Sequence, residues 1–184
     1  MDFFPRISPP KDIHDRYLSI SRAGGRRVGV LRGSLSLLNG VSLEKVSWVD
    51  RADILKNPEW MNDWKVLMTR VQGTSAAVET MFLSRPIISG PGEACSETYL
   101  VAGRFDSEEK AGRYAIYLRT RFVRFLVSLR KATQDAAKDV YAFVPDIRLN
   151  REWTEEKLYT RYGLTKGEIA FIESMVRPME ASDE

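Results

Sequence analysis

The chain has 184 residues, of which 43% are hydrophobic and 29% charged, so it has the length and composition of a globular protein with a sizeable core. Its net charge is +3 and its pI is about 9.0, values that permit polyanionic partners without requiring one. The single cysteine and single histidine exclude an intramolecular disulfide framework, a cysteine-based zinc cluster and a multi-histidine metal site. We expect a cytoplasmic protein, because no apolar run is long enough to span a bilayer and the first residues lack a signal-peptide pattern.

The N-terminal part predicts an irregular arm followed by short strands. Residues 1–15 contain three prolines, which favours an arm without regular structure. From Arg16 onward, polar and apolar residues alternate with the period of a strand. Gly24-Gly25 and Asn39-Gly40 are strong signals for hairpin turns. Strands are therefore expected at 17–21, 28–31 and 41–49.

The middle of the chain predicts further strands. A short helix is expected through Trp60 and Trp64, and a loop is expected from Gly73 onward. The apolar run at 65–70 indicates a buried strand between them. Two more strands are expected on either side of the Gly-Pro-Gly turn at 90–92, namely 86–89 and 98–102.

One long helix is predicted over residues 107–134, with Asp106 or Ser107 as its N-cap. Apolar residues fill most of its circumference, and the remaining edge is basic. Either this edge contacts DNA phosphates, or its side chains are solvated or pair with acids elsewhere. Within an arc of about 80° lie Lys110, Arg113, Tyr117, Arg121, Arg124 and Lys131.

Two short helices are predicted after Pro145. Thr154 is a good N-cap for the first helix, and Gly163 stands where that helix should end. Thr165 and Glu168 form a capping-box pattern that opens the second helix, which is expected to run to about Val176. The residues after it form an acidic tail that is expected to be disordered.

Motifs for phosphate binding or nucleophilic catalysis are absent from the sequence, which has no Gly-rich phosphate loop, no Gly-x-Ser-x-Gly elbow and no Cys–His pair. Asp53, Asp63 and Lys65 have the residue types of a metal-dependent nuclease, in which carboxylates hold a divalent metal. The same spacing arises by chance in structural positions, so both interpretations stay open. The tryptophans are expected to be packing anchors rather than a base-stacking ladder; they are Trp48, Trp60, Trp64 and Trp153.

An arginine-rich hairpin is the best candidate for DNA contact. Residues 16–32 hold five arginines and no acidic residue. Arg22, Arg26 and Arg27 flank the Gly-Gly turn, so they are placed to project from a hairpin tip. Arginine can contact guanine bidentately in the major groove. The alternative is an ordinary exposed turn.

Three segments of the chain carry motifs of a known bacterial family. The motifs are Asp63–Leu67, Pro86–Ile88 with Glu97–Val101, Phe122-x-x-Phe125-Leu126-Val127, Thr133–Ala136, Phe143-Val144-Pro145, Trp153-Thr154, Tyr162–Thr165 and Glu168–Glu173. With these motifs the chain resembles the C-terminal region of adenine-specific DNA methyltransferases of type II restriction–modification systems, some of which are fused to an endonuclease. The resemblance covers roughly residues 50–178, and the last sixty residues carry most of it.

The resemblance implies a target-recognition domain, which binds a short DNA sequence so that a catalytic domain can flip the adenine out of the duplex. It also implies an α+β fold with a twisted, mostly antiparallel sheet, one long central helix and a C-terminal helical hairpin. The implied partners are double-stranded DNA and a methyltransferase catalytic domain or subunit, with no membrane. S-adenosylmethionine, and in some members Mg²⁺, belong to the parent family rather than to this chain.

The sequence departs from the family in lacking both the Asn-Pro-Pro-Tyr-type motif that grips the adenine and the Gly-containing loop for S-adenosylmethionine. We therefore expect no methyl transfer by this chain alone, no catalytic, cofactor-binding or metal-binding residues, and a fragment, a split subunit or a degenerate gene product. The expected organisation is an arm at 1–15, a recognition domain at 16–145 that includes the helix 107–134, a helical hairpin at 146–178 and a tail at 179–184.

The residues expected to contact DNA come from three places in the sequence. The hairpin supplies arginines, the first loop supplies polar residues that can pair with bases, and the end of the long helix supplies weaker candidates. They are Arg22, Arg26, Arg27, Arg32, Arg70, Gln72, Thr74, Ser75, Lys131 and Gln134. Two alternatives remain: a protein-interaction subunit that docks on a methyltransferase, and a small metal-dependent nuclease.

Overall fold

The computed structural model describes residues 27–33, 44–51, 54, 56–69, 83–96, 99–130 and 138–179. Within them the chain is an α+β protein with two three-stranded sheets and four α-helices. The strands are β1 (Arg27–Gly33), β2 (Glu44–Asp50), β3 (Trp64–Thr69), β4 (Ile87–Ser89), β5 (Glu93–Cys95) and β6 (Tyr99–Phe105). The helices are α2 (Glu108–Arg119), α3 (Arg121–Ser128), α4 (Glu155–Tyr162) and α5 (Lys166–Met175), with 3-10 helices η2 (Pro58–Asn62) and η3 (Lys138–Tyr141).

The strands form two separate sheets, where the sequence predicts a single one. In the first sheet, β1 pairs antiparallel with β2 and parallel with β5. In the second, β3 pairs antiparallel with both β4 and β6. The reason is the turn between β4 and β5, where Gly92 has a φ of +82° and donates its N–H to Met61 O at 2.7 Å. This turn directs β5 into the other sheet.

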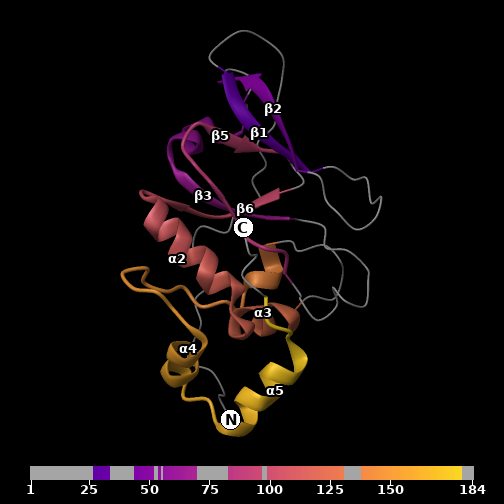
Figure 1. The fold of residues 1–184 in the computed structure, drawn as a ribbon, viewed down its shortest axis with the longest axis vertical. Helices are drawn as coiled ribbons and strands as arrows, with labels where there is room; N and C mark the ends of the chain where they lie inside the picture. Colours follow the sequence, from indigo (N-terminus) through magenta and orange to yellow (C-terminus); the bar gives the residue numbers. More distant parts are fainter. Residues whose placement is uncertain are drawn as a thin grey trace.

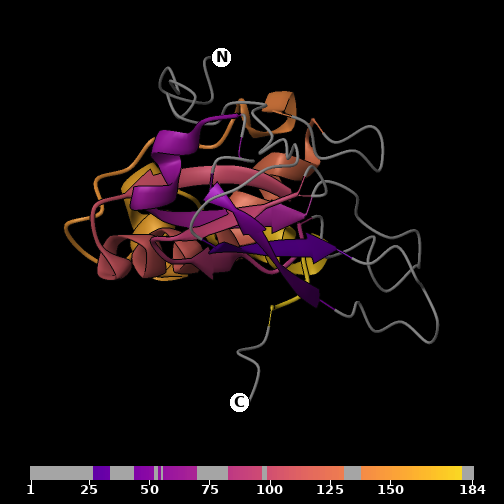
Figure 2. The same cartoon turned by 90° about the horizontal axis from the view of Figure 1, so that it is seen from above.

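Both faces of the β4-β3-β6 sheet are covered. Val66 and Met68 of β3 belong to the larger core, which α2 and α3 complete on one face. Leu67, between them in sequence, packs with Trp60 and Met61 of η2 on the opposite face. Figure 1 shows the β2-β1-β5 sheet at one end of the molecule and α4 and α5 at the other. The view from above in Figure 2 places β1 and β2 nearest the reader, in front of the helices.

The prediction of a single helix over 107–134 is wrong. The chain forms two helices here, α2 and α3, which are separated by a break at Thr120. Thr120 has a ψ of 144°, which is not helical, and it serves as the N-cap of α3. Its hydroxyl accepts from Val123 N at 3.3 Å and donates to Tyr117 O at 2.7 Å. Threonine side chains compete for backbone groups in this way, which explains the break. The second helix then ends at Ser128.

The predicted C-terminal helices are confirmed. Thr154 caps α4 through its side chain, and Gly163 ends that helix with a φ of 63°. Thr165 and Glu168 form the complete capping box at the start of α5. The strands expected around 28–31 and 41–49 are also confirmed as β1 and β2. The predicted arm, both hairpin turns and the loop at Gly73 lie outside the described residues, and the domain boundaries stay predictions.

Candidate nucleic-acid interface

Most residues predicted to contact DNA fall outside the part of the chain that the structure describes. Only Arg27 and Arg32 lie within it, both on β1. The register of the sheet places Arg27 opposite Asp50 and Arg32 opposite Lys45. The predicted DNA-contacting residues that lie outside the described ranges are Arg22, Arg26, Arg70, Gln72, Thr74, Ser75, Lys131 and Gln134.

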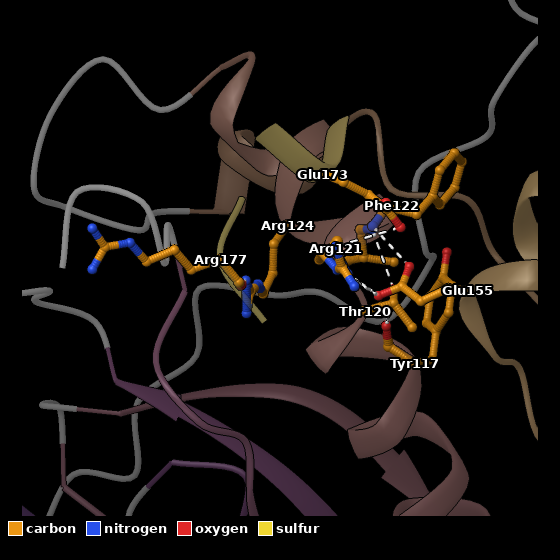
Figure 3. Close-up of polar contacts among 9 residues, drawn as sticks. Tyr117, Thr120, Arg121, Phe122, Arg124, Glu155, Glu173 and Arg177 are labelled. Atoms are coloured by element: carbon orange, nitrogen blue, oxygen red, sulfur yellow. Dashed lines mark hydrogen bonds and ion pairs between the residues drawn. The ribbon is translucent and has the colours of Figure 1, made fainter. Parts of the chain in front are cut away.

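The basic edge predicted for the long helix does not form as one free surface. Arg124 is completely buried, and its Nη2 donates to the carbonyl of Arg177. Arg121 instead reaches the C-terminal helices, with Nη1 3.4 Å from a carboxylate oxygen of Glu173. Figure 3 shows these two arginines leaving α3 on different sides. The interpretation that the arginines pair elsewhere in the protein therefore holds for Arg121.

Two more cations of this edge that the structure describes, Lys110 and Arg113, are also paired. Lys110 binds Asp106, which precedes the N-cap of α2, at 2.6 Å, and Arg113 binds Glu109 at 2.6 Å as an i,i+4 pair within α2. Arg113 also donates to Leu149 O at 2.9 Å, which ties the loop before α4 to α2. Because these side chains already have partners within the protein, the described part of the basic edge is not a free phosphate-binding surface.

Burial leaves Arg124 short of partners. Its Nε and Nη1 have no hydrogen-bond partner among the described residues. Removal from water lowers the pKa of this guanidinium to about 10, because desolvation penalises the charged form. Arg124 therefore supports the contact between α3 and the residues after α5 and is not exposed to a DNA surface.

A carboxylate from α4 completes the N-terminus of α3. Glu155 accepts hydrogen bonds from the backbone N–H of Arg121 at 2.6 Å and of Phe122 at 3.3 Å (Figure 3). These N–H groups have no partner within a helix, and the helix dipole favours negative charge beside them. The break at Thr120 exposes them, so the helix break and the attachment of α4 are parts of one arrangement.

The loop before α4 gathers cations around a buried tryptophan. Trp153 is 2% exposed, and its indole N–H donates to Arg148 O at 2.9 Å. The guanidinium of Arg151 lies 4.4 Å from the centre of the Trp153 ring, and that of Arg161 lies 5.1 Å from it. We call Arg148, Arg151, Trp153 and Arg161 the tryptophan–arginine cluster.

The charge of this cluster is not neutralised locally. The structure gives no ion pair between Arg148, Arg151 or Arg161 and any described acidic residue, and all three are exposed. Stacking on an aromatic ring fixes a guanidinium plane and leaves its N–H edge available. Such an edge suits phosphate oxygens, which arginine binds through charge-assisted hydrogen bonds.

The sequence signal for this cluster is three arginines close to one tryptophan over residues 148–161. The burial of Trp153 confirms the packing role predicted for it, whereas the three arginines were not predicted as a site. Because Glu152, Glu155 and Glu156 lie among them, the net charge of the segment conceals the cluster. Only the three-dimensional arrangement separates the stacked arginines from the acids.

The candidate nuclease residues do not form a catalytic set in the described part of the chain. Lys65 is completely buried, and its ammonium donates to the carbonyls of Trp60, Asp63 and Gly90 at 3.3, 2.7 and 3.0 Å. The Asp63 carboxylate pairs with Arg104 at 3.2 Å. Asp53 lies outside the described residues. Lys65 therefore joins η2 to the turn after β4 and does not face a substrate.

Metal and membrane contacts find no support among the described residues. No group of three or more His, Cys, Asp and Glu side chains in those ranges is placed to hold a metal ion. No helix in the same ranges is long and apolar enough to cross a membrane.

Cys95 is buried, and this burial raises the pKa of its thiol to about 12, so it lacks the thiolate character of a nucleophile.

Comparisons with known proteins identify no relative. The chain matches no protein-family model, no curated protein and no solved structure. The geometry and chemistry of the described residues must therefore carry the functional argument.

The contact between Glu155 and α3 can be tested by replacing the carboxylate with an amide. We expect Glu155→Gln to lower the free energy of unfolding by about 2 kcal/mol, because two backbone donors lose a charged acceptor. Urea denaturation measures the change. Glu156→Gln is the matched control, since Glu156 lies in the same helical turn and is exposed. Equal losses in the two variants would contradict the role assigned to Glu155.

The burial of Lys65 predicts a pH-dependent contribution to stability. Desolvation lowers the pKa of Lys65 to about 8, below the value of 10.5 expected when the lysine is exposed. The unfolded chain then binds this proton more tightly than the folded chain does. Stability contributed by Lys65 therefore rises as the pH increases from 8 to 10.5. Relative to Lys65→Met, the unfolding free energy of the wild type should rise by about 2 kcal/mol over this range. A difference that stays constant with pH would contradict the prediction.

Proposed function

We propose that this chain is a sequence-specific DNA-recognition domain that serves an adenine-specific DNA methyltransferase of a restriction–modification system. The observation that carries the proposal is the tryptophan–arginine cluster. Its three arginines are exposed and have no acidic partner among the described residues, and two of them, Arg151 and Arg161, lie over the Trp153 ring. Double-stranded DNA presents a dense row of phosphates that such a group can neutralise.

The cluster would bind the DNA backbone rather than the bases. Its arginines lie in the loop before α4 and on α4, and the guanidinium groups of Arg151 and Arg161 lie over the Trp153 ring. Phosphate contacts of this kind orient a protein on the duplex but carry no sequence information. The cluster therefore supplies affinity and orientation, and another part of the chain must supply specificity.

The arginine-rich segment before and within β1 is the proposed base-reading element. Arg27 and Arg32 lie at opposite ends of β1, and the sheet register places a second cation, Lys45, opposite Arg32. Arg22 and Arg26 precede the strand in sequence. Arginine side chains at the end of a β-ribbon suit contacts to guanine in the major groove.

In this proposal a methyltransferase partner, and not this chain, carries out the methyl transfer. Binding of the duplex by this chain would position the target adenine at the partner's active site, where the base is flipped out of the helix. The chain has no methyltransferase motif, so S-adenosylmethionine belongs with the partner in this proposal. The buried position of Lys65 argues against the nuclease alternative, which required that amine near a substrate.

The salt dependence of DNA binding tests the cluster. Arg151→Gln combined with Arg161→Gln should weaken binding to every duplex alike and reduce the slope of log affinity against log salt by about 2, one for each phosphate contact removed. Arg104→Gln is the matched control, because Arg104 also lies over a tryptophan, 4.5 Å from the Trp60 ring, but pairs with Asp63. The control should leave the slope unchanged. If the double variant keeps the wild-type slope while folded by circular dichroism, the cluster does not bind DNA.

A further inference from the structure

The outer face of α5 is uncharged and partly apolar. Gly167, Ala170, Phe171, Ser174 and Met175 follow the spacing i, i+3, i+4, i+7, i+8, which places them on one face of the helix. All five are exposed, with Phe171 at 56% and Met175 at 43%. We call these five residues the α5 face. An exposed helix face without charge is typical of a protein contact.

A groove between α3 and α5 adjoins this face. Its cavity volume is about 250 Å³, and an apolar cavity of about 150 Å³ is already large enough to hold benzene. At Gly167 a side chain would meet nothing within 4 Å, so the glycine leaves one wall open. The apolar lining is Phe122, Phe125, Leu126, Leu164, Phe171 and Ile172.

One edge of the α5 face carries one cation and one anion. Lys166 and Glu173 are seven residues apart, so they occupy the same edge two turns apart. The structure gives Lys166 no ion pair with a described residue. Glu173 contacts Arg121 at 3.4 Å, and its side chain is still 40% exposed.

We propose that the α5 face is the interface between two copies of this chain, with the two α5 helices packed antiparallel about a two-fold axis. In this arrangement Phe171 of each copy enters the groove beside Gly167 of the other. Lys166 of each copy lies next to Glu173 of the partner subunit, because antiparallel packing brings matching edges together in opposite order.

Self-complementarity is the reason to choose a second copy over another protein. A two-fold interface needs every projecting group and its recess on the same surface. The α5 face presents the exposed part of the Phe171 ring, whose other side packs against Phe125 at a ring-centroid distance of 5.9 Å, and, beside Gly167, an open recess. The edge beside this face carries Lys166 and Glu173, at a spacing that two turns of an antiparallel copy reproduce, and Glu173 would contact the partner's lysine with the part of its carboxylate that Arg121 leaves exposed.

The first test is the molar mass of the full chain by sedimentation velocity over about two orders of magnitude in concentration, without DNA. We expect the wild type to shift from monomer to dimer. Phe171→Glu should keep the chain monomeric at every concentration. Ile116→Glu is the matched control, because Ile116 on α2 is also an exposed apolar residue, at 38%, but lies off the α5 face. The control should dimerise like the wild type.

Charge reversal tests the antiparallel order without disturbing the groove. Lys166→Glu should weaken the dimer about tenfold by placing two acids together. Adding Glu173→Lys to the same chain exchanges the two charges, so the double variant should recover much of the lost affinity. A wild type that stays monomeric throughout overturns the proposal, as does a dimer that is unaffected by both Phe171→Glu and Lys166→Glu. Because no DNA is present, these outcomes are independent of the proposed recognition function.

Discussion

The attachment of the Glu155 carboxylate to the N-terminus of α3 is the contact on which the helical half of the molecule depends. It requires the break at Thr120, because only a new helix start presents the free N–H groups of Arg121 and Phe122. It also fixes α4 against α3 and therefore places the loop that leads into α4. The tryptophan–arginine cluster lies on that loop and on α4, so its position depends on this carboxylate together with the hydrogen bond from Arg113 to Leu149 O.

Each half of the structure contains one fully buried cation, Lys65 in the sheet half and Arg124 in the helical half, and the two cations have different numbers of hydrogen-bond partners. In the sheet half, the ammonium of Lys65 is surrounded by three backbone carbonyls and joins η2 to the turn after β4. In the helical half, Arg124 is buried with a single carbonyl partner among the described residues. In both halves the buried cation links two segments, because it donates to backbone carbonyls of another part of the chain. The exposed arginines of the cluster remain available for a partner.

The sequence predicts those parts of the fold that short-range signals determine. Thr154, Gly163 and the Thr165–Glu168 capping box act on backbone groups a few residues away, and the helices they delimit form as expected. The break at Thr120 was missed because the apolar periodicity continues through it, while the stabilising carboxylate comes from 34 residues away. The strand β5 was not predicted, because the turn at 90–92 was expected to join the strands at 86–89 and 98–102, and a three-residue segment carries too little pattern to indicate a strand or its neighbour. Burial of Arg124 and the stacking on Trp153 likewise depend on tertiary contacts.

Selection of duplexes from a random-sequence pool by the purified full chain tests whether this protein recognises a DNA sequence. Selection near 0.1 M salt and without magnesium favours specific contacts over nonspecific backbone binding. Enrichment of one short motif is the predicted result. A pool that stays random, with only weak and salt-sensitive binding, would contradict the account and would assign recognition to another protein.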